Sequence, residues 1–252
     1  MRLLAALTFF TRLPFWRIRE IPAEAFKRVV PLWPLAGWLT GFVTALVLWL
    51  CGSFMPLTLA WIVALGARLL LTGCLHEDGL ADFIDGFGGG TTRDRTLAIM
   101  KDSHIGTYGV IGLIVYFALM LQLPATLSRD TLCVVVLAGD CWAKCCAAQL
   151  INLLPYARKE EEAKNKTVYD RMKWHEFLLC LFFGLAPAAA MTFWLDWLPL
   201  SFFWLLGIPV AVMLLMALLM KRRLQGYTGD CCGATFLLCE LSFYLSVLIS
   251  LQ

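Results

Sequence analysis

The sequence predicts an all-α, polytopic integral membrane protein: a bundle of about seven transmembrane helices with an N-terminal interfacial helix. Of its 252 residues, 60% are hydrophobic and 15% are charged, whereas soluble domains carry roughly 25% charged residues. Seven apolar runs each have about the 17–25 residues that a helix needs to cross hydrocarbon. We find no internal repeat and no soluble module, so we expect residues 1–252 to form a single membrane-embedded domain.

The N-terminal stretch MRLLAALTFFTRLPFW has a short apolar run and no small-x-small cleavage site. We therefore expect it to be retained and to lie in the membrane interface. The expected spans that follow, in order, cover residues 29–52, 55–73, 109–127, 131–154, 177–195, 202–220 and 231–251. Periodicity alone leaves six or eight crossings open.

Positive charge is strongly biased to one side of this topology. Eighteen of the 21 lysines and arginines lie in residues 1–28, 74–108, 155–176 and 221–230. Two expected spans separate each of these segments from the next, so all four lie on the same side of the membrane. The positive-inside rule makes this side the cytoplasm. The sequence thus predicts a multi-pass membrane protein with its polar loops in the cytoplasm.

The stretch from residue 72 to 109 is where acidic residues gather, between two apolar runs. It reads TGCLHEDGLADFIDGFGGGTTRDRTLAIMKDSHIGTYG. If residues 78–87 are helical, Asp78, Asp82 and Asp85 fall on one face, where like charges repel. A divalent cation reverses that cost because Mg²⁺ favours carboxylate oxygens. We therefore predict Asp78, Asp82 and Asp85 as metal ligands for Mg²⁺.

Glycines and basic residues directly follow these acids. Gly86, Gly88, Gly89 and Gly90 are expected to end the helix in a loop whose free N–H groups meet an anion. The predicted substrate or phosphate contacts are Gly88, Gly89, Arg95, Lys101, Ser103, Arg158 and Asp230. A magnesium–phosphate site is the interpretation that unites them.

Two interpretations stay open for Asp102 and for His76. Asp102 is a fourth ligand or a general base, or else a helix cap; His76 contacts substrate or is a hydrogen-bonded interfacial histidine. Asp140 and Lys144 are spaced i,i+4 inside a span and predict an ion pair, because an isolated charge in hydrocarbon is costly. Glu240, also inside a span, requires a cavity or a partner.

These segments resemble the cobalamin synthase family, the adenosylcobinamide-GDP ribazoletransferases. The run from 72 to 109 resembles the family signature. Phe10-Thr11-Arg12-Leu13-Pro14, the segments 31–37 and 155–158, and Gly226-Tyr-Thr-Gly-Asp230 through Glu240 resemble further family segments in the same order. The similarity therefore covers essentially the whole chain. The loop after Arg158, KEEEAKNK, and the additional acid Glu77 depart from the pattern.

The resemblance implies a magnesium-dependent transfer by an enzyme of the bacterial inner membrane. The adenosylcobinamide-phosphate group of adenosylcobinamide-GDP passes to the 3′-hydroxyl of α-ribazole or its 5′-phosphate, and GMP is released. Asp82, Asp85, Asp102 and His76 become the candidate catalytic residues, with Asp102 or His76 as the base. Besides these substrates and the lipid bilayer, the implied partners are a second copy or other cobamide-assembly enzymes. No nucleic-acid partner is expected.

Two alternatives fit parts of the sequence. Asp82-x-x-Asp85-Gly86 resembles half of the motif of CDP-alcohol phosphatidyltransferases, but the A-R that should follow is absent. A cation transporter would account for Asp140, Lys144 and Glu240. Transporters concentrate polar residues near the midplane, whereas the dense acidic cluster here lies in a cytoplasmic loop, which favours an enzyme.

Overall fold

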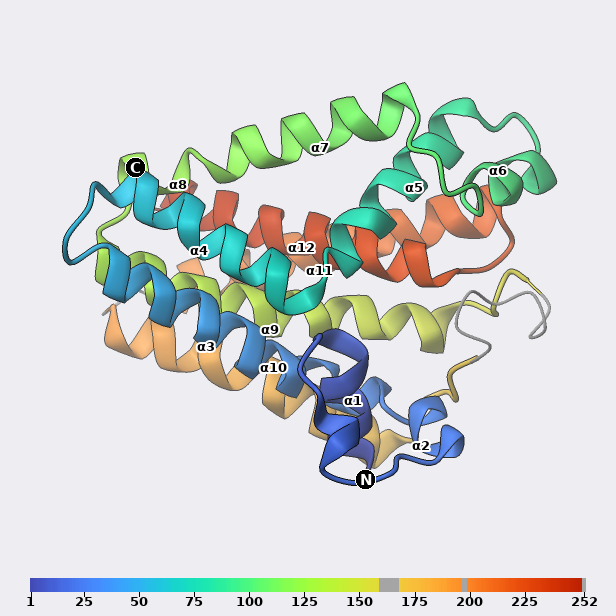
Figure 1. The fold of residues 1–252 in the computed structure, drawn as a ribbon, viewed down its shortest axis with the longest axis horizontal. Coiled ribbons are helices and arrows are strands. Elements are labelled where there is room, and N and C mark those ends of the chain that lie inside the picture. Colours follow the sequence, from blue (N-terminus) through green and yellow to red (C-terminus); the bar gives the residue numbers. More distant parts are fainter. Residues whose placement is uncertain (159–167, 196–198, 251–252) are drawn as a thin grey trace.

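The computed structural model describes residues 1–158, 168–195 and 199–250, and the described chain folds into a bundle of long helices (Figure 1). No β-strand forms within these ranges. The helices are α1 (Arg2–Phe10), η1 (Phe15–Arg17), α2 (Ala23–Lys27), η2 (Val30–Leu32), α3 (Trp33–Cys51), α4 (Leu57–Thr72), α5 (Leu75–Gly89), α6 (Arg93–Ile99), α7 (Thr107–Met120), α8 (Leu123–Thr126), α9 (Arg129–Leu153), α10 (Trp174–Trp194), α11 (Pro199–Arg223) and α12 (Gly229–Ser250).

The predicted class, a polytopic helical membrane protein, is confirmed. Six helices of the described chain are long and apolar enough to cross a membrane, and the pair α4 and α5 makes a seventh if its two bent halves count as one span. The expected span 109–127 corresponds to α7 and α8 together. The expected span 55–73 corresponds to α4, which by itself is short.

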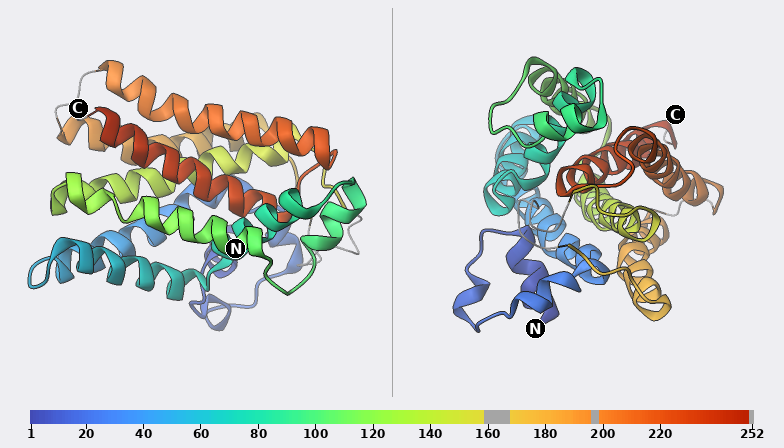
Figure 2. Two further views of the ribbon diagram at one scale, coloured as in Figure 1. Left: turned by 90° about the horizontal axis from the view of Figure 1, so that it is seen from above. Right: turned by 90° about the vertical axis from the view of Figure 1, so that its right-hand side faces the viewer.

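α9 forms the centre of the bundle, and α3, α10 and α12 pack around it. In the end-on view α9 lies in the middle, while α1 and α2 cover one flank (Figure 2). Small residues permit this packing, since apolar helices in lipid associate by close backbone approach. A Cβ at Gly139 of α9 would collide with the Tyr244 ring of α12.

One end of the bundle carries α6, residues 155–158 and the turn between α11 and α12 (Figure 1). We call it the basic end, because Arg93, Arg158 and Arg223 lie there. Arg93 donates to the carbonyls of Leu224 and Ala157, and Arg223 donates to the carbonyl of Gly90. These bonds fix α6 against the adjoining turns. The departure noted after Arg158, residues 159–167, lies outside the described residues.

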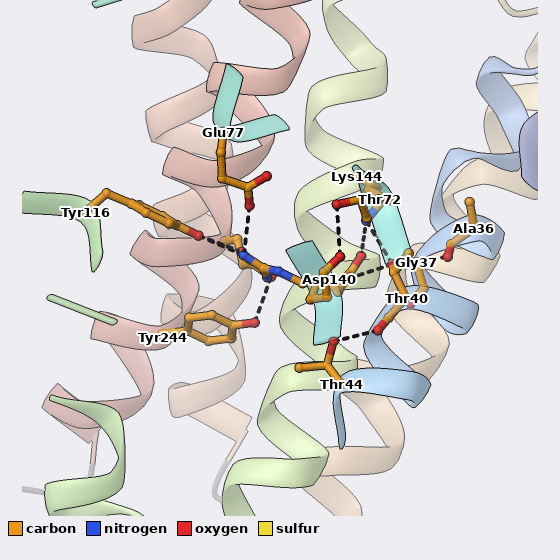
Figure 3. A network of polar contacts seen from close by, with 12 residues as sticks. Ala36, Gly37, Thr40, Thr44, Thr72, Glu77, Tyr116, Asp140, Lys144 and Tyr244 are labelled. Carbon is orange, nitrogen blue, oxygen red and sulfur yellow. Dashed lines mark hydrogen bonds and ion pairs between the residues drawn. The ribbon is translucent and has the colours of Figure 1, made fainter. Parts of the chain in front are cut away.

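Buried charges in the bundle are paired. Arg68 of α4 is 3% exposed, and its Nη1 lies 2.6 Å from Glu240 Oε1 of α12. Its Nη2 lies 3.5 Å from Glu77 Oε1 of α5 and donates to the Tyr116 hydroxyl of α7. The Tyr244 hydroxyl donates to Glu240 (Figure 3). The predicted need of Glu240 for a partner is thereby confirmed, and four helices are joined.

The predicted ion pair between Asp140 and Lys144 is confirmed as well. The Thr40 hydroxyl of α3 donates to Asp140 Oδ2 at 2.7 Å, and Lys144 Nζ lies 3.1 Å from that hydroxyl (Figure 3). The pair therefore also joins α3 to α9.

A sharp turn separates α4 from α5, whose axes meet at 88°. Two consecutive residues, Gly73 with φ 66° and Cys74 with φ 58°, adopt the left-handed conformation that makes the turn. The Arg12 N–H donates to the Leu71 carbonyl at 2.7 Å, and a Cβ at Gly73 would collide with the Arg12 side chain. The turn thus depends on a glycine and is covered by the N-terminal segment.

Gly73→Ala should lower the free energy of unfolding by about 1–2 kcal/mol, because a left-handed non-glycine residue is strained. Displacement of Arg12 would add to this loss. Gly66→Ala is the matched control, since a Cβ there meets open space in the middle of α4, and it should stabilise by about 0.5–1 kcal/mol. Thermal unfolding in detergent measures both. Equal stability of the two variants would contradict this account of the turn.

Candidate functional site

A partly enclosed hollow of about 210 Å³ lies where α1, α3, α5, α9 and α12 converge toward the basic end. We call it the aromatic cavity, after its six aromatic lining residues: Phe9, Phe10, Trp33, Tyr156, Tyr169 and Phe236. Several are packed edge to face, with Trp33 5.5 Å from both Phe10 and Tyr169 between ring centroids. The walls are therefore rigid and largely apolar.

Polar groups from four parts of the chain line the same cavity. They are His76, Asp78, Lys144, Arg158 and Asp230. Lys144 lies over the Phe236 ring at 4.0 Å while paired with Asp140, so its charge is neutralised within the wall. His76 is 4% exposed, stacks on Phe10 and has no hydrogen-bond partner at Nε2.

Close contact between α5 and α12 brings these groups together. A Cβ at Gly79 would lie 3.1 Å from the Asp230 carbonyl oxygen, and a Cβ at Gly233 would lie 3.4 Å from the His76 backbone. Two facing glycines thus let the first turns of the helices touch. Asp78 and Asp230, 152 positions apart in the sequence, line one cavity as a result.

An open cleft of about 620 Å³ adjoins the cavity and shares Tyr156 and Arg158 with it. We call it the basic cleft, because Arg93, Lys101 and Arg158 line it together with the single acid Asp94. Arg158 Nη2 donates to the Leu97 carbonyl at 3.0 Å, which holds the guanidinium between α6 and the cavity. Burial raises the pKa of Tyr156, so this shared hydroxyl stays protonated at neutral pH.

Asp85 has a structural contact that the sequence did not reveal. Its Oδ2 accepts the N–H of Gly106 at 2.7 Å, and its Oδ1 accepts the N–H of Gly109 at 2.8 Å. The carboxylate therefore caps the first turn of α7, where the helix dipole favours negative charge. The structure thus shows a structural role for Asp85, and its predicted role as a metal ligand stays a prediction.

The predicted helix over 78–87 is present as part of α5, which places Asp78 and Asp82 one turn apart. Asp78 is exposed and lines the aromatic cavity, and Asp82 is half-buried. Among the residues that the structure describes, no group of three or more acidic, histidine or cysteine side chains is arranged to hold a metal ion. The metal site stays a prediction.

The prediction that the helix ends in a loop from Gly86 onward is wrong. α5 continues through Gly88 and Gly89, and the N–H of Gly90 donates to the Gly86 carbonyl at 2.9 Å. N–H groups inside a helical turn are taken up by the helix itself. Gly88 instead packs on a ring, because a Cβ there would lie 2.8 Å from Tyr108 Cγ. Gly88 therefore serves packing of α5 against α7, whereas a Cβ at Gly89 would meet Ile99 of α6.

Asp102 lies in the loop between α6 and α7, next to Lys101 in the sequence, and is not itself among the residues that line the cavity or the cleft. Hydrogen bonds from the side chain and backbone of His104 lower the pKa of its carboxyl, which makes it a weaker base. Ser103 and Arg95 are exposed nearby. Of the predicted phosphate contacts, the structure brings Lys101 and Arg158 into one cleft.

The aromatic walls were not found from the sequence. Phe10 and Trp33 lie in the two N-terminal motifs and Phe236 lies in an apolar helix, where an aromatic residue carries no mark of its function. The one available signal was the predicted topology, which places the first two motifs and the acidic stretch at the same side of the membrane.

Comparison with known proteins identifies the family. A family model described as cobalamin-5-phosphate synthase (CobS) matches residues 2–248. The chain is 36% identical over 249 residues to the adenosylcobinamide-GDP ribazoletransferase of Shewanella amazonensis, covering 98% of this chain and 94% of that protein. It is 35% identical over 247 residues to the protein of the same name from Shewanella woodyi, covering 96% and 93%.

No solved structure matches the chain. The match to the family model spans nearly the whole length, and the relatives align from end to end. The chain therefore belongs to the cobalamin-5-phosphate synthase family.

Proposed function

We propose that the chain transfers the adenosylcobinamide-phosphate group of adenosylcobinamide-GDP to the 3′-hydroxyl of α-ribazole or its 5′-phosphate. The hydroxyl oxygen bonds to the phosphorus next to the cobinamide, the bond from that phosphorus to the GMP oxygen breaks, and GMP leaves. The hydroxyl proton passes to a base. The observation that carries the proposal is the junction of a partly enclosed aromatic cavity with a more open basic cleft at Tyr156 and Arg158.

The donor chemistry at this junction fits Mg²⁺. Proteins commonly bind Mg²⁺ through one or two carboxylates together with substrate phosphates and water, so a site of three protein ligands is not required. Asp78 and Asp230 line the same cavity, and Asp82 is the next acid along α5. Asp85 is left out because both its oxygens hold α7. When bound, the ion neutralises charge on the pyrophosphate and on the departing phosphate.

Side chains around the junction supply the other tasks. Lys101 and Arg158 attract and orient the diphosphate in the basic cleft. His76 is the better placed of the two predicted bases, because it lines the cavity with Asp78 whereas Asp102 does not. Its Nε2, buried without a partner, is able to take up the proton of the attacking hydroxyl.

The cavity and cleft lie toward the basic end, which carries the loops predicted to be cytoplasmic. We place this end in the cytoplasm and the bundle in the bacterial inner membrane, which gives the site access to nucleotide substrates. The transporter alternative loses its motivation, because Lys144 is paired with Asp140 and Glu240 with Arg68. The family match favours ribazole over a CDP-alcohol as the substrate class.

Purified protein in lipid vesicles should release GMP from adenosylcobinamide-GDP only when α-ribazole is added. Chelation by EDTA should abolish release, and added MgCl₂ should restore it, because the diphosphate charge is then neutralised again. Chromatography of GMP measures the reaction. GMP release that does not depend on α-ribazole would contradict the transfer, and full activity in EDTA would remove Mg²⁺ from the proposal.

Asp78→Asn and Asp85→Asn should fail in different ways. Asp78→Asn should lower kcat by on the order of 100-fold, the scale on which one transition-state electrostatic contact acts, with unchanged thermal stability. Asp85→Asn should lower the free energy of unfolding by about 1–3 kcal/mol, because one N–H of the α7 cap loses its acceptor. Asp130→Asn, at an exposed aspartate paired with Arg129, is the control. A stable but inactive Asp85→Asn would return Asp85 to the metal site.

Lys101→Gln should raise the KM for adenosylcobinamide-GDP by about three- to fivefold, since one exposed charge contact contributes up to about 1 kcal/mol. The rise should shrink at high salt because the contact is screened. Lys221, exposed at the end of α11 and not a residue of the cleft, provides the control Lys221→Gln. Steady-state kinetics at two ionic strengths measure both, and equal effects of the two variants would exclude a specific role for Lys101.

A further inference from the structure

We propose that the aromatic cavity binds the benzimidazole base of α-ribazole, and that Trp33 recognises it by a hydrogen bond to the unsubstituted ring nitrogen. This assignment rests on the proposed function and goes beyond it, because it gives one substrate's base a place and a specificity-determining residue. Three features match that ring: the size of the cavity, its aromatic lining, and the unpartnered indole N–H of Trp33, one of its lining residues.

The size and walls fit a flat bicyclic ring. Whole drug-sized ligands occupy roughly 300–1,000 Å³, so a cavity of about 210 Å³ admits a fragment of a substrate and excludes a corrin. Phe10, Trp33, Tyr169 and Phe236 present aromatic surface to it. Stacking of a base on an aromatic side chain contributes about 1–3 kcal/mol. An uncharged aromatic ring is the ligand that such walls favour.

One of the lining residues, Trp33, carries a buried donor that lacks a partner. Trp33 is 3% exposed, lines the cavity, and has no hydrogen-bond acceptor at Nε1. An unpaired buried donor costs about 1–3 kcal/mol, and indole N–H can only donate. Benzimidazole attached to ribose has one ring nitrogen that accepts a hydrogen bond and no N–H of its own. The ligand therefore satisfies the donor and introduces no unpaired polar group.

The position of the two carboxylates determines the orientation of the bound α-ribazole. Asp78 and Asp230 line the cavity, and Arg158 belongs to both hollows. With the base among the aromatic rings, the ribose lies toward these polar groups and its 3′-hydroxyl meets a diphosphate held in the basic cleft. With the α-ribazole base in the aromatic cavity and the guanine nucleotide in the basic cleft, the attacking 3′-hydroxyl and the phosphorus would meet at the wall that the two hollows share.

Guanine of the second substrate is the competing occupant. Its edge has several N–H donors, which need acceptors in a cavity whose surface is more apolar than polar. Asp78 and Asp230 could accept them only if these carboxylates did not serve the metal. Guanine is also tethered to the diphosphate that suits the open cleft. The observations favour benzimidazole, and the experiment separates the two.

The experiment combines one variant with one changed ligand atom. α-Indole riboside has the shape of α-benzimidazole riboside but carries a C–H in place of the accepting nitrogen. In the wild-type protein its KM should be about fivefold higher, the value of one modest hydrogen bond. In Trp33→Phe, which keeps the aromatic wall, the two ribosides should have equal KM values. The KM for adenosylcobinamide-GDP should change less than twofold.

Trp61→Phe is the matched control, because the Trp61 Nε1 is buried and already donates to the Met120 carbonyl, away from the cavity. It should keep the fivefold preference. In a second pair, Phe236→Leu should raise the KM for α-ribazole about tenfold through lost stacking. Phe243→Leu, at a fully buried ring elsewhere on α12, should not.

Each result decides whether the aromatic cavity binds benzimidazole or guanine. A fivefold preference that persists in Trp33→Phe, or an α-ribazole KM unaffected by Phe236→Leu, overturns the assignment. A KM rise for adenosylcobinamide-GDP instead places guanine in the cavity and overturns it too. If Trp33→Phe fails to fold, the wild-type preference and Phe236→Leu still decide. Absence of α-ribazole-dependent GMP release in the wild type would refute the proposed function, which is a separate outcome.

Discussion

A guanidinium inside an apolar bundle has to be neutralised, and much of the site depends on how Arg68 meets that requirement. An isolated charge in hydrocarbon costs roughly 2.5–3.5 kcal/mol on insertion scales, so Arg68 fixes whichever helices supply its partners. Glu240 of α12, Glu77 of α5 and Tyr116 of α7 do so. Because Glu77 lies between His76 and Asp78, the same contact holds the first turn of α5 in place. His76 and Asp78, which are proposed to do chemistry, are thus the immediate sequence neighbours of Glu77, whose contact with Arg68 holds them in position.

The second buried pair supports the same site from the opposite wall. Lys144 is neutralised by Asp140 and contacts the Thr40 hydroxyl, which joins α9 to α3. Its ammonium also lies over the Phe236 ring. An unpaired lysine would draw water into the cavity, whereas the paired one stiffens an aromatic wall. What the sequence shows as two residues spaced i,i+4 in a span therefore contributes to the shape of a binding surface as well as to the stability of the bundle.

Much of the fold follows from hydropathy, because a helix that crosses hydrocarbon must be both long and apolar. The acidic stretch was recognisable for the same reason, since six acids stand out between apolar runs. The partners of those acids were not recognisable. Asp85 was predicted as a metal ligand, and its contact with the N–H groups of Gly106 and Gly109 became visible only when the structure placed α7 beside it. Glu240 required a partner, yet nothing in its local pattern points to Arg68, 172 positions earlier.

The contrast between the two hollows bears on why transfer would prevail over hydrolysis. An activated diphosphate in an open cleft is accessible to water, so selectivity has to come from the position of the competing hydroxyl. A cavity that holds a base by its rings makes that hydroxyl effectively intramolecular. Well-oriented groups reach effective concentrations of roughly 10⁵ M or more, far above that of water. The aromatic cavity then does more than bind a substrate. By fixing the base at one end of α-ribazole, it determines which oxygen reaches the phosphorus at the other.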